Sequence, residues 1–168
     1  QPLLADPRWR CVLTCGFAGG LSPALAVGEV IYDMEENFPL NVQLQRSSAK
    51  PARLHCAERV AVTAAEKAAL HARTGADAVE MESHIIRRLC RARGLPSATV
   101  RVISDAANDD LPLDFNALMK PDGRLHFPRL LGAVLTRPQK IPALLALGRR
   151  SRFAAGQLAA ALRATLSA

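Results

Sequence analysis

Acidic side chains at the ends of two apolar segments are the residues of this sequence best suited to chemistry. Glu80 and Glu82 flank Met81 where one segment enters a helix, and Ser104 and Asp105 follow the other. An acid rarely ends a buried strand unless it is solvated, paired or used. A partly desolvated carboxylic acid can release a proton near neutral pH, and a carboxylate can accept hydrogen bonds from two neighbouring hydroxyls. Asp105 is therefore a candidate general acid, and Glu82 a candidate ligand of a ribose diol.

Each of these residues also has a structural role open to it. Taken alone, Asp105 is more often a cap for a following turn, and the charge of Glu82 suits the positive end of the helix that it enters. Met81 suits a hydrophobic core as well as the apolar face of a sugar. The residue types by themselves leave both readings open.

A glycine-rich segment, G-F-A-G-G at residues 16–20, is a third candidate. It follows an apolar, β-branched run and is expected to form a tight turn. It lacks the spacing of a dinucleotide fingerprint or a P-loop. Its use would be close approach of the backbone near Ala18 and Gly19 to a flat ligand.

The elements that must position these residues can be read from periodicity and punctuation. Thr63 followed by Glu66 forms a capping box, and Gly75 ends the helix that it opens. Residues 33–51, rich in Pro, Asn and Ser, are expected to form a long loop. Expected strands are 10–14, 29–32, 53–63, 76–79 and 97–103; expected helices are 64–73, 83–93 and several after residue 127.

The succession of strand, helix and strand over residues 76–103 predicts a βαβ unit and an α/β sheet with right-handed crossovers. In open α/β sheets, ligands bind outside the carboxyl ends of the strands. The glycine segment, Glu80-Met81-Glu82 and Ser104-Asp105 all lie at such ends. We therefore expect the three to converge on one crevice.

Length, charge and cysteine content limit the remaining choices. A chain of 168 residues fits one domain with a real core. Residues 120–168 carry nine Lys or Arg and one acid, a net charge of +8. Because the whole chain has a net charge of +7, the first 119 residues carry −1. Such a basic tail suits a membrane surface, nucleic acid or a solvated face. Only Phe127 and Phe153 supply aromatic rings there, which disfavours nucleic acid.

The four cysteines show no CxxC pair and no spacing with His that suits zinc, so no metal site is expected. Cys11 and Cys15 share strand parity and are expected to be buried free thiols in a reduced, cytoplasmic compartment. The apolar stretch at residues 141–148 is too short to span a membrane, and no signal peptide is recognised.

Three motifs together resemble one enzyme superfamily. G-F-A-G-G-L at residues 16–21, followed by Pro23 and V-G-E-V at 27–30, is similar to the GxAGGL…P…xGD stretch of purine nucleoside phosphorylases and methylthioadenosine/S-adenosylhomocysteine nucleosidases. V-E-M-E-S at 79–83 resembles their ribose-binding (D/E)MES/A motif, and R-V-I-S-D at 101–105 their R-x-(I/V)-SD motif. The motifs occur in the family's order and spacing over residues 8–118.

The resemblance implies a fold and a role for each matching residue. The fold would be α/β, a three-layer α-β-α sandwich of the nucleoside phosphorylase type, with a central mixed sheet and extra C-terminal helices. Asp105 would protonate or hydrogen-bond purine N7 as the glycosidic bond breaks, with Ser104 orienting it. Glu82 would hold the ribose hydroxyls, Met81 would pack on the sugar, and the backbone near Ala18 and Gly19 would line the base and ribose. Glu80 is expected to be structural.

Departures from the family pattern leave the nucleophile open between phosphate and water. Thr14 and Phe17 occupy the positions where phosphorylases of this group carry a phosphate-binding Arg and Ser. The family's N-terminal glycine loop and water-activating acid are not matched, so the sequence is expected to be an N-terminal truncation. Near Val60 and Ala61, related nucleosidases carry an aromatic residue that stacks on the purine. No cofactor is expected, and inorganic phosphate is an alternative co-substrate to water.

The basic tail is similar to the hopanoid-associated phosphorylase branch, through a P-D-G-R turn at 121–124 and later Arg-Pro and Ile-Pro pairs. That branch is thought to remove adenine from adenosylhopane. We therefore expect a core at residues 1–126, helices at 127–168 that dock on an anionic inner membrane or simply pack on the sheet, and a homo-oligomer. The alternatives are a soluble methylthioadenosine/S-adenosylhomocysteine nucleosidase and a non-catalytic nucleoside-binding relative.

Overall fold

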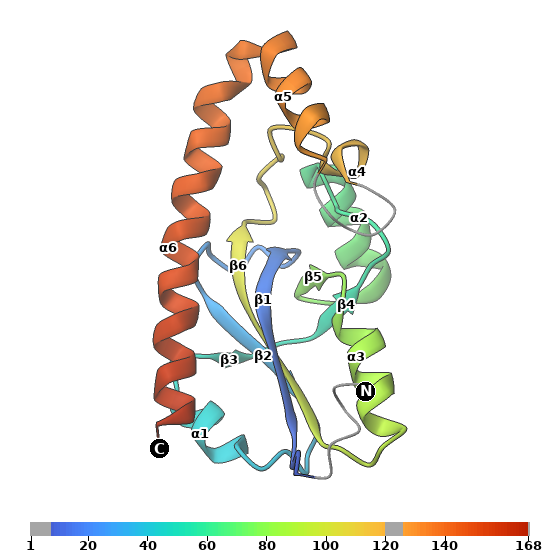
Figure 1. Ribbon diagram of the computed structural model, residues 1–168, viewed down its shortest axis with the longest axis vertical. Coiled ribbons are helices and arrows are strands. Elements are labelled where there is room, and N and C mark those ends of the chain that lie inside the picture. Colours follow the sequence, from blue (N-terminus) through green and yellow to red (C-terminus); the bar gives the residue numbers. More distant parts are fainter. Residues whose placement is uncertain (1–7, 120–125, 168) are drawn as a thin grey trace.

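A six-stranded mixed sheet lies at the centre of the protein, whose computed structural model describes residues 8–119 and 126–167 (Figure 1). The strand order is β3-β2-β6-β1-β5-β4. The long central pair, β1 and β6, is parallel, whereas β2 runs antiparallel to β6 and β5 antiparallel to β1. The strands are β1 Val12–Gly20, β2 Val30–Met34, β3 Lys50–Pro51, β4 Leu54–Cys56, β5 Ala78–Glu80 and β6 Ser97–Asp105.

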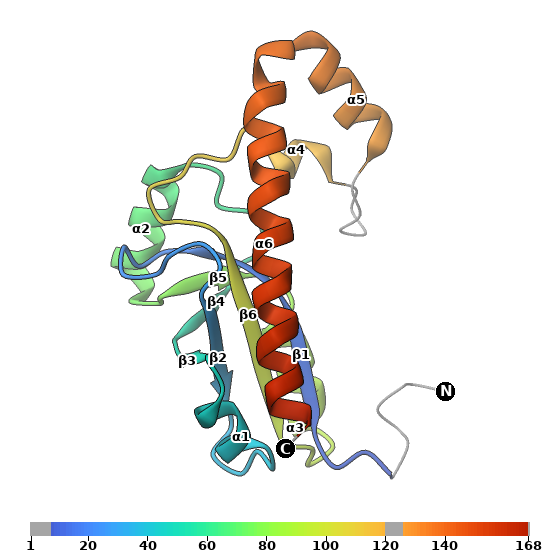
Figure 2. The same ribbon diagram turned by 90° about the vertical axis from the view of Figure 1, so that its left-hand side faces the viewer.

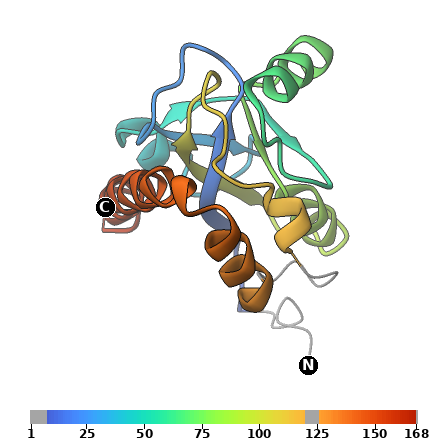
Figure 3. The same ribbon diagram turned by 90° about the horizontal axis from the view of Figure 1, so that it is seen from above.

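Helices cover both faces of this sheet (Figures 1 and 3). The long helix α6 crosses one face, and α2 and α3 lie on the other, which gives the expected three-layer α/β architecture with an additional C-terminal helix. The helices are α1 Asn41–Arg46, α2 Ala64–Thr74, α3 Ser83–Arg91, α4 Phe115–Leu118, α5 Phe127–Thr136 and α6 Ile141–Leu166, with a 3₁₀ turn, η2, at Pro138–Lys140.

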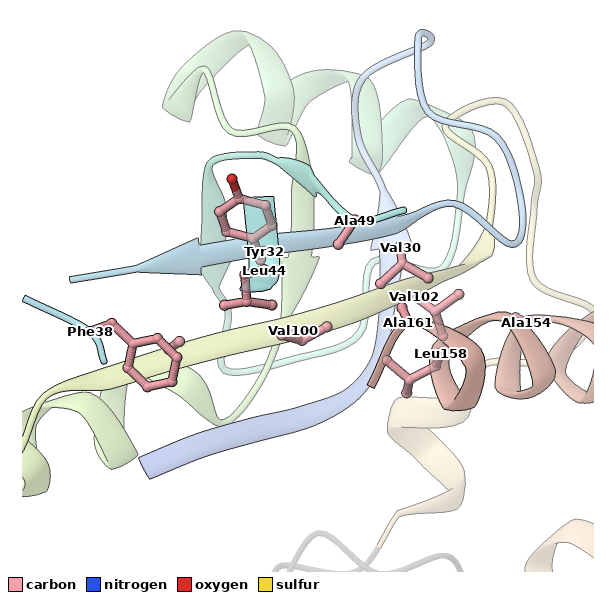
Figure 4. Close-up of a cluster of buried hydrophobic side chains, with 11 residues drawn as sticks. Val30, Tyr32, Phe38, Leu44, Ala49, Val100, Val102, Ala154, Leu158 and Ala161 are labelled. Carbon is pink, nitrogen blue, oxygen red and sulfur yellow. The ribbon is translucent and has the colours of Figure 1, made fainter. Parts of the chain in front are cut away.

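The main core lies between α6 and the sheet, as Figure 4 shows. Val100 and Val102 of β6 point toward α6, which contributes Ala154, Leu158 and Ala161 at helical spacing. Phe38 and Leu44 close the far end of the same cluster. Because β6 is covered on both faces, its apolar run is buried almost throughout.

The predicted helix 64–73 forms as α2, with the expected capping box. The Thr63 hydroxyl accepts a hydrogen bond from the Glu66 N–H, and the Glu66 carboxylate accepts one from the Thr63 N–H. Gly75 ends the helix in the left-handed conformation, with φ of 63°. These contacts join residues a few positions apart, so the sequence pattern was sufficient to predict them.

The glycine segment is not a turn, contrary to expectation. Residues 16–20 continue β1, because the parallel pairing with β6 extends from Val12 to Gly19. The glycines serve close packing instead: a Cβ on Gly19 would lie 3.2 Å from Asp105 Oδ2, and one on Gly20 would lie 3.3 Å from the Asp105 carbonyl oxygen.

Two further expectations about local structure are wrong. The segment 33–51 is not a continuous loop, because burial of Leu44 in the core stabilises the short helix α1 and because β3 pairs with β2. The expected strand 53–63 is limited to Leu54–Cys56. Beyond it the chain turns away, and both backbone polar groups of Val60 bond to the side chain of Asn116.

The predicted βαβ unit is also wrong. β5, α3 and β6 do follow one another, but β1 lies between the two strands, and β5 runs opposite to β6. Residues 121–124, where a turn was predicted, lie outside the described residues.

The four cysteines are free thiols; this was expected for Cys11 and Cys15. Cys11 packs against the main core, but Cys15 is exposed, contrary to expectation. α6 packs on β6 and β2 and leaves the surface around Cys15 and Phe17 of β1 open. Within residues 8–119 and 126–167, no helix has the length and apolar character needed to cross a membrane.

Candidate active site

A cavity of about 450 Å³ lies where β1, β5 and β6 meet, and all six predicted site residues line it. β1 contributes Ala18 and Gly19, the end of β5 and the residues after it contribute Met81 and Glu82, and β6 contributes Ser104 and Asp105. The lining residues from outside the sheet are Arg59, Val60, Ala61, Leu111, Phe115, Met119, Leu147 and Ser151.

Strand register, rather than a shared strand direction, brings the three motifs together. Gly19 pairs with Asp105 on one side and with Val79 on the other. β5 is short and antiparallel, so Met81 and Glu82 emerge beside the last part of β1. The motifs therefore converge as predicted, although one of the three strands runs in the opposite direction.

Asp105 is buried at the bottom of this site and both of its carboxylate oxygens are bound. The Ser104 hydroxyl donates to Oδ1 at 2.6 Å, and the ammonium of Lys67 donates to Oδ2 at 2.5 Å. Ser104 Oγ also lies 3.3 Å from the Ala18 carbonyl oxygen. Hence Ser104 and Lys67 together fix the orientation of the candidate acid.

Lys67 was missed by the sequence analysis. It lies on α2, three residues before Leu70, and both side chains face the interior. A lysine on the apolar face of a helix is the signal that could have been noticed, because Lys is almost never fully buried unless it is paired. Its partner, 38 residues further along the chain, could not be identified from the pattern.

The two glutamates on either side of Met81 lie in different environments. The Glu80 carboxylate is buried and accepts hydrogen bonds from Arg101, from the Ser83 hydroxyl and from the backbone N–H groups of Glu82 and Ser83. The Glu82 side chain is 67% exposed and contacts Arg101 Nη2 at 3.2 Å. Glu82 therefore retains acceptor capacity for a ligand, whereas Glu80 stabilises the start of α3.

Opposing effects act on Glu80. Burial by itself raises the pKa of this carboxyl group, but the hydrogen bonds from Ser83, Arg101 and the backbone outweigh burial and hold the pKa below its usual value. Glu80 is therefore the anionic partner of Arg101, whose guanidinium is 2% exposed.

Aromatic side chains in the cavity come from unexpected positions. Val60 and Ala61 line the wall, as the sequence comparison with nucleosidases suggested, and they offer no ring. Phe17 and Phe115 supply rings to the same cavity. Thr14 occupies the other position where phosphorylases bind phosphate. Its hydroxyl lies 3.2 Å from Thr99 Oγ1 and 3.5 Å from the Ala98 carbonyl oxygen, within the sheet. Among the described residues, no cluster of three or more His, Cys, Asp or Glu that could hold a metal ion is present.

A mixed six-stranded sheet between helix layers is the α/β fold of the nucleoside phosphorylase and nucleosidase class. The family model described as "Phosphorylase superfamily" matches residues 49–135, and the chain belongs to this superfamily.

Solved structures support the same fold. The chain is similar to 5'-methylthioadenosine/S-adenosyl homocysteine nucleosidase of Campylobacter jejuni (TM-score 0.53, 21% identity, 64% of this chain and 61% of that one). Futalosine hydrolase of Helicobacter pylori gives a TM-score of 0.53 at 21% identity, over 64% of this chain and 60% of that one. The nucleosidase of Colwellia psychrerythraea in complex with adenine gives a TM-score of 0.60 at 16% identity, over 94% of this chain and 66% of that one. The chain thus spans about 60% of the length of the first two.

Proposed function

We propose that this protein cleaves the N-glycosidic bond of an adenosine-type nucleoside and releases adenine. The observation that carries the proposal is the buried Asp105, bound by Ser104, in the same cavity as the exposed carboxylate of Glu82. Membership of the Phosphorylase superfamily supports this class of reaction.

In the proposed reaction, the bond between ribose C1' and purine N9 breaks and its electron pair moves to the purine. Asp105 donates a proton to N7, which neutralises the negative charge on the leaving base. Glu82 accepts hydrogen bonds from the ribose hydroxyls, and its charge favours the positive charge that develops on the sugar. A water or phosphate oxygen bonds to C1'. The proton that attacking water loses passes to solvent, from which Asp105 takes up a proton again. Met81, Ala18 and Gly19 line the nucleoside.

Substitution of Asp105 by Asn tests this proposal. We expect kcat for adenine release to fall by about 10²–10⁴-fold, because one general acid typically contributes that much. Methylthioadenosine and adenosylhopane would be compared, each with and without phosphate, in the full-length protein. D33N is the matched control, since Asp33 pairs with Arg87 at 3.0 Å, away from the cavity. An unchanged rate in D105N would contradict the mechanism, and phosphate dependence would identify the nucleophile.

For the substrate itself, we propose a nucleoside with a large apolar substituent, namely adenosylhopane. The support is the resemblance of the tail to the hopanoid-associated branch, together with an apolar cavity wall. Leu111, Phe115, Met119 and Leu147 line the same cavity as the carboxylates. Leu147 belongs to α6 and the other three precede α5 in the chain, so these apolar side chains are available to pack against an apolar substituent.

We further propose that α5, η2 and the first half of α6 dock on an anionic membrane. These elements extend beyond the sheet as a helical hairpin (Figures 1 and 2). α5 has no buried residue, and Phe127, Leu131 and Leu135 are at least 60% exposed. Residues 126–167 contain no Asp or Glu, and the exposed cations of the hairpin are Arg129, Arg137, Lys140, Arg149, Arg150 and Arg152.

Apolar side chains flanked by cations suit the interface of an anionic leaflet, where each Lys or Arg near the surface is worth about 1 kcal/mol. The second half of α6 has a different role, because Ala154, Leu158 and Ala161 pack in the main core. The docking proposal therefore covers residues 127–153, a shorter segment than the 127–168 expected from sequence.

Sedimentation with lipid vesicles tests the docking. We expect binding to phosphatidylglycerol vesicles that weakens with salt, and little binding to phosphatidylcholine. The variant R129Q/R137Q/K140Q should lose it. The control R46Q/R73Q/R93Q removes the same charge from exposed positions on the body and should bind normally. No binding at moderate salt, equal loss in both variants, or self-association of the hairpin without lipid would contradict the proposal.

An alternative substrate class is methylthioadenosine or S-adenosylhomocysteine, as in the names of two of the similar structures. Rapid turnover of these compounds without lipid, together with no activity on adenosylhopane, would favour it. Tight adenine binding without any turnover would instead favour a non-catalytic nucleoside-binding relative. The cytoplasmic location rests on the cysteine pattern and the homo-oligomer on the resemblance, and both stay predictions.

A further inference from the structure

Lys67 is a fully buried cation in direct contact with the candidate general acid. Its side chain is 0% exposed, and its ammonium donates to Asp105 Oδ2 at 2.5 Å, to the Ala106 carbonyl at 2.8 Å and to the Asp109 carbonyl at 2.9 Å. An ammonium has three protons, and these three acceptors use all of them. The group is therefore held in one orientation.

Burying such a cation lowers the stability of the fold unless other interactions compensate, so its presence calls for an explanation. Removing an ammonium from water costs several kcal/mol, and a well-packed apolar residue in its place is often neutral or stabilising. The position is on the interior face of α2 next to Leu70, where an apolar side chain would serve packing. Lys67 contacts Asp105, which lines the cavity, so the buried cation is in direct contact with the candidate site.

The surroundings of Asp105 make the contact specific. Gly19 lies against the same oxygen that Lys67 binds, since a Cβ there would come within 3.2 Å of Oδ2. Ser104 holds the other oxygen at 2.6 Å. The carboxylate is thus enclosed by the backbone of β1, a hydroxyl and an ammonium, and small shifts of Lys67 would be transmitted to it.

We propose that Lys67 is a positioning residue that orients Asp105 and stabilises the negative charge formed on it when it protonates the purine. This role rests on the proposed function. For this step Asp105 first takes up a proton from solvent. The proton then passes from the Asp105 carboxyl to N7, the electron pair of the C1'–N9 bond moves to the base, a water or phosphate oxygen bonds to C1', and Asp105 returns to the carboxylate that Ser104 and Lys67 bind. Lys67 keeps its three protons throughout. A preorganised cation beside developing charge lowers the barrier without reorganisation.

Removal of the side chain and chemical rescue test the role in the full-length protein. K67A should lower kcat for adenine release by about 10²-fold or more and change KM by less than about threefold. Propylammonium matches the atoms removed and should restore the rate in a saturable manner, at least about tenfold. 1-Propanol has the same size without charge and should not. K50A is the control, because Lys50 forms an exposed ion pair with Glu29.

A kinetic double-mutant cycle with D105N then identifies the group through which Lys67 acts. If it acts through Asp105, K67A should cost less than about twofold in the D105N background, and propylammonium should give no rescue there. Thermal unfolding of each variant would establish that it is folded. The rescue of K67A does not depend on D105N, so the proposal remains testable if D105N is unstable.

The outcomes separate the two proposals. Full activity of K67A, equal rescue by propanol, or an equal fold loss in both backgrounds would show that Lys67 is structural, while adenine release by the wild type still supports the proposed function. No adenine release by the wild type from any nucleoside would contradict the proposed function and this role with it.

Discussion

Two carboxylates separated by one residue have different tasks in this protein because their environments differ. Glu80 is buried against Arg101, and Glu82 is largely exposed at the cavity. A buried ion pair that loses one member leaves an uncompensated charge, whereas an exposed pair contributes little to stability. The structure therefore predicts opposite phenotypes for the two positions.

E80Q should lower the free energy of unfolding by about 3–5 kcal/mol near pH 7, the usual cost of breaking a buried pair. E82Q should change it by less than about 1 kcal/mol but should raise KM for a nucleoside. Urea titrations and steady-state kinetics of both variants would check this. Comparable stability of the two would contradict the assignment of Glu80 to structure and Glu82 to ligand binding.

The pKa of Glu80 also predicts a pH dependence. Because its folded-state pKa is held below the usual 4.5, Glu80 contributes stability that is present above about pH 4.5 and is lost as the pH falls through the folded-state pKa. E80Q lacks this titration, so its free energy of unfolding should fall less steeply on acidification than that of the wild type. Urea titrations between about pH 6 and pH 3 would measure both slopes, and parallel curves would contradict the prediction.

At the scale of elements, the packing of α6 against the segment that leads into β2 depends on a glycine. Gly28 has φ of 91°, and a Cβ there would lie 2.3 Å from Cε1 of Phe153. Leu147 and Ser151, six and two residues before Phe153 on α6, line the cavity. The contact at Gly28 thus helps to hold the helix that forms one wall of the site.

G28A should therefore destabilise the protein more than G94A does. Both glycines have positive φ, but nothing lies within 4 Å of a Cβ on Gly94. We expect about 1 kcal/mol for G94A from backbone conformation. G28A should cost roughly 1 kcal/mol more, because the half-exposed ring of Phe153 must turn away and lose its packing. Urea titrations would measure the difference, and equal values would contradict this account.

For the whole molecule, the structure combines a densely packed body with a hairpin that has little packing of its own. β6 is buried nearly throughout, whereas α5 has no buried residue and contacts mainly α4 and η2. Local opening is least costly where few apolar contacts are made. Binding of the hairpin to a membrane should therefore reduce local opening more in the hairpin than in the densely packed body.

Hydrogen exchange should show this contrast directly. In solution, amides of Phe127–Thr136 should exchange with opening free energies of about 0–2 kcal/mol, and amides of β6 near the global value. Anionic vesicles should slow exchange in α5 and leave β6 unchanged if the hairpin docks. Strong protection of α5 without lipid would contradict this description of the hairpin.

The sequence by itself determined the chemical types at the site and the helices that local signals specify. The capping box at Thr63, the left-handed Gly75 and the helix after Glu82 depend on residues a few positions apart, so a pattern can predict them. The motifs carrying Met81, Glu82, Ser104 and Asp105 were correctly expected to share one crevice. Their roles in a reaction stay predictions.

Only the tertiary structure decided the strand order, the mixed strand directions and the partners of the buried charges. The glycine segment became strand because β6 pairs with it, and Lys67 met Asp105 because α2 packs beside the end of β6. The two parts of the C-terminal tail differ in burial: the second half of α6 packs in the main core, whereas α5 is exposed. Each of these outcomes depends on contacts between residues far apart in the chain, and a local pattern has no means of specifying such partners.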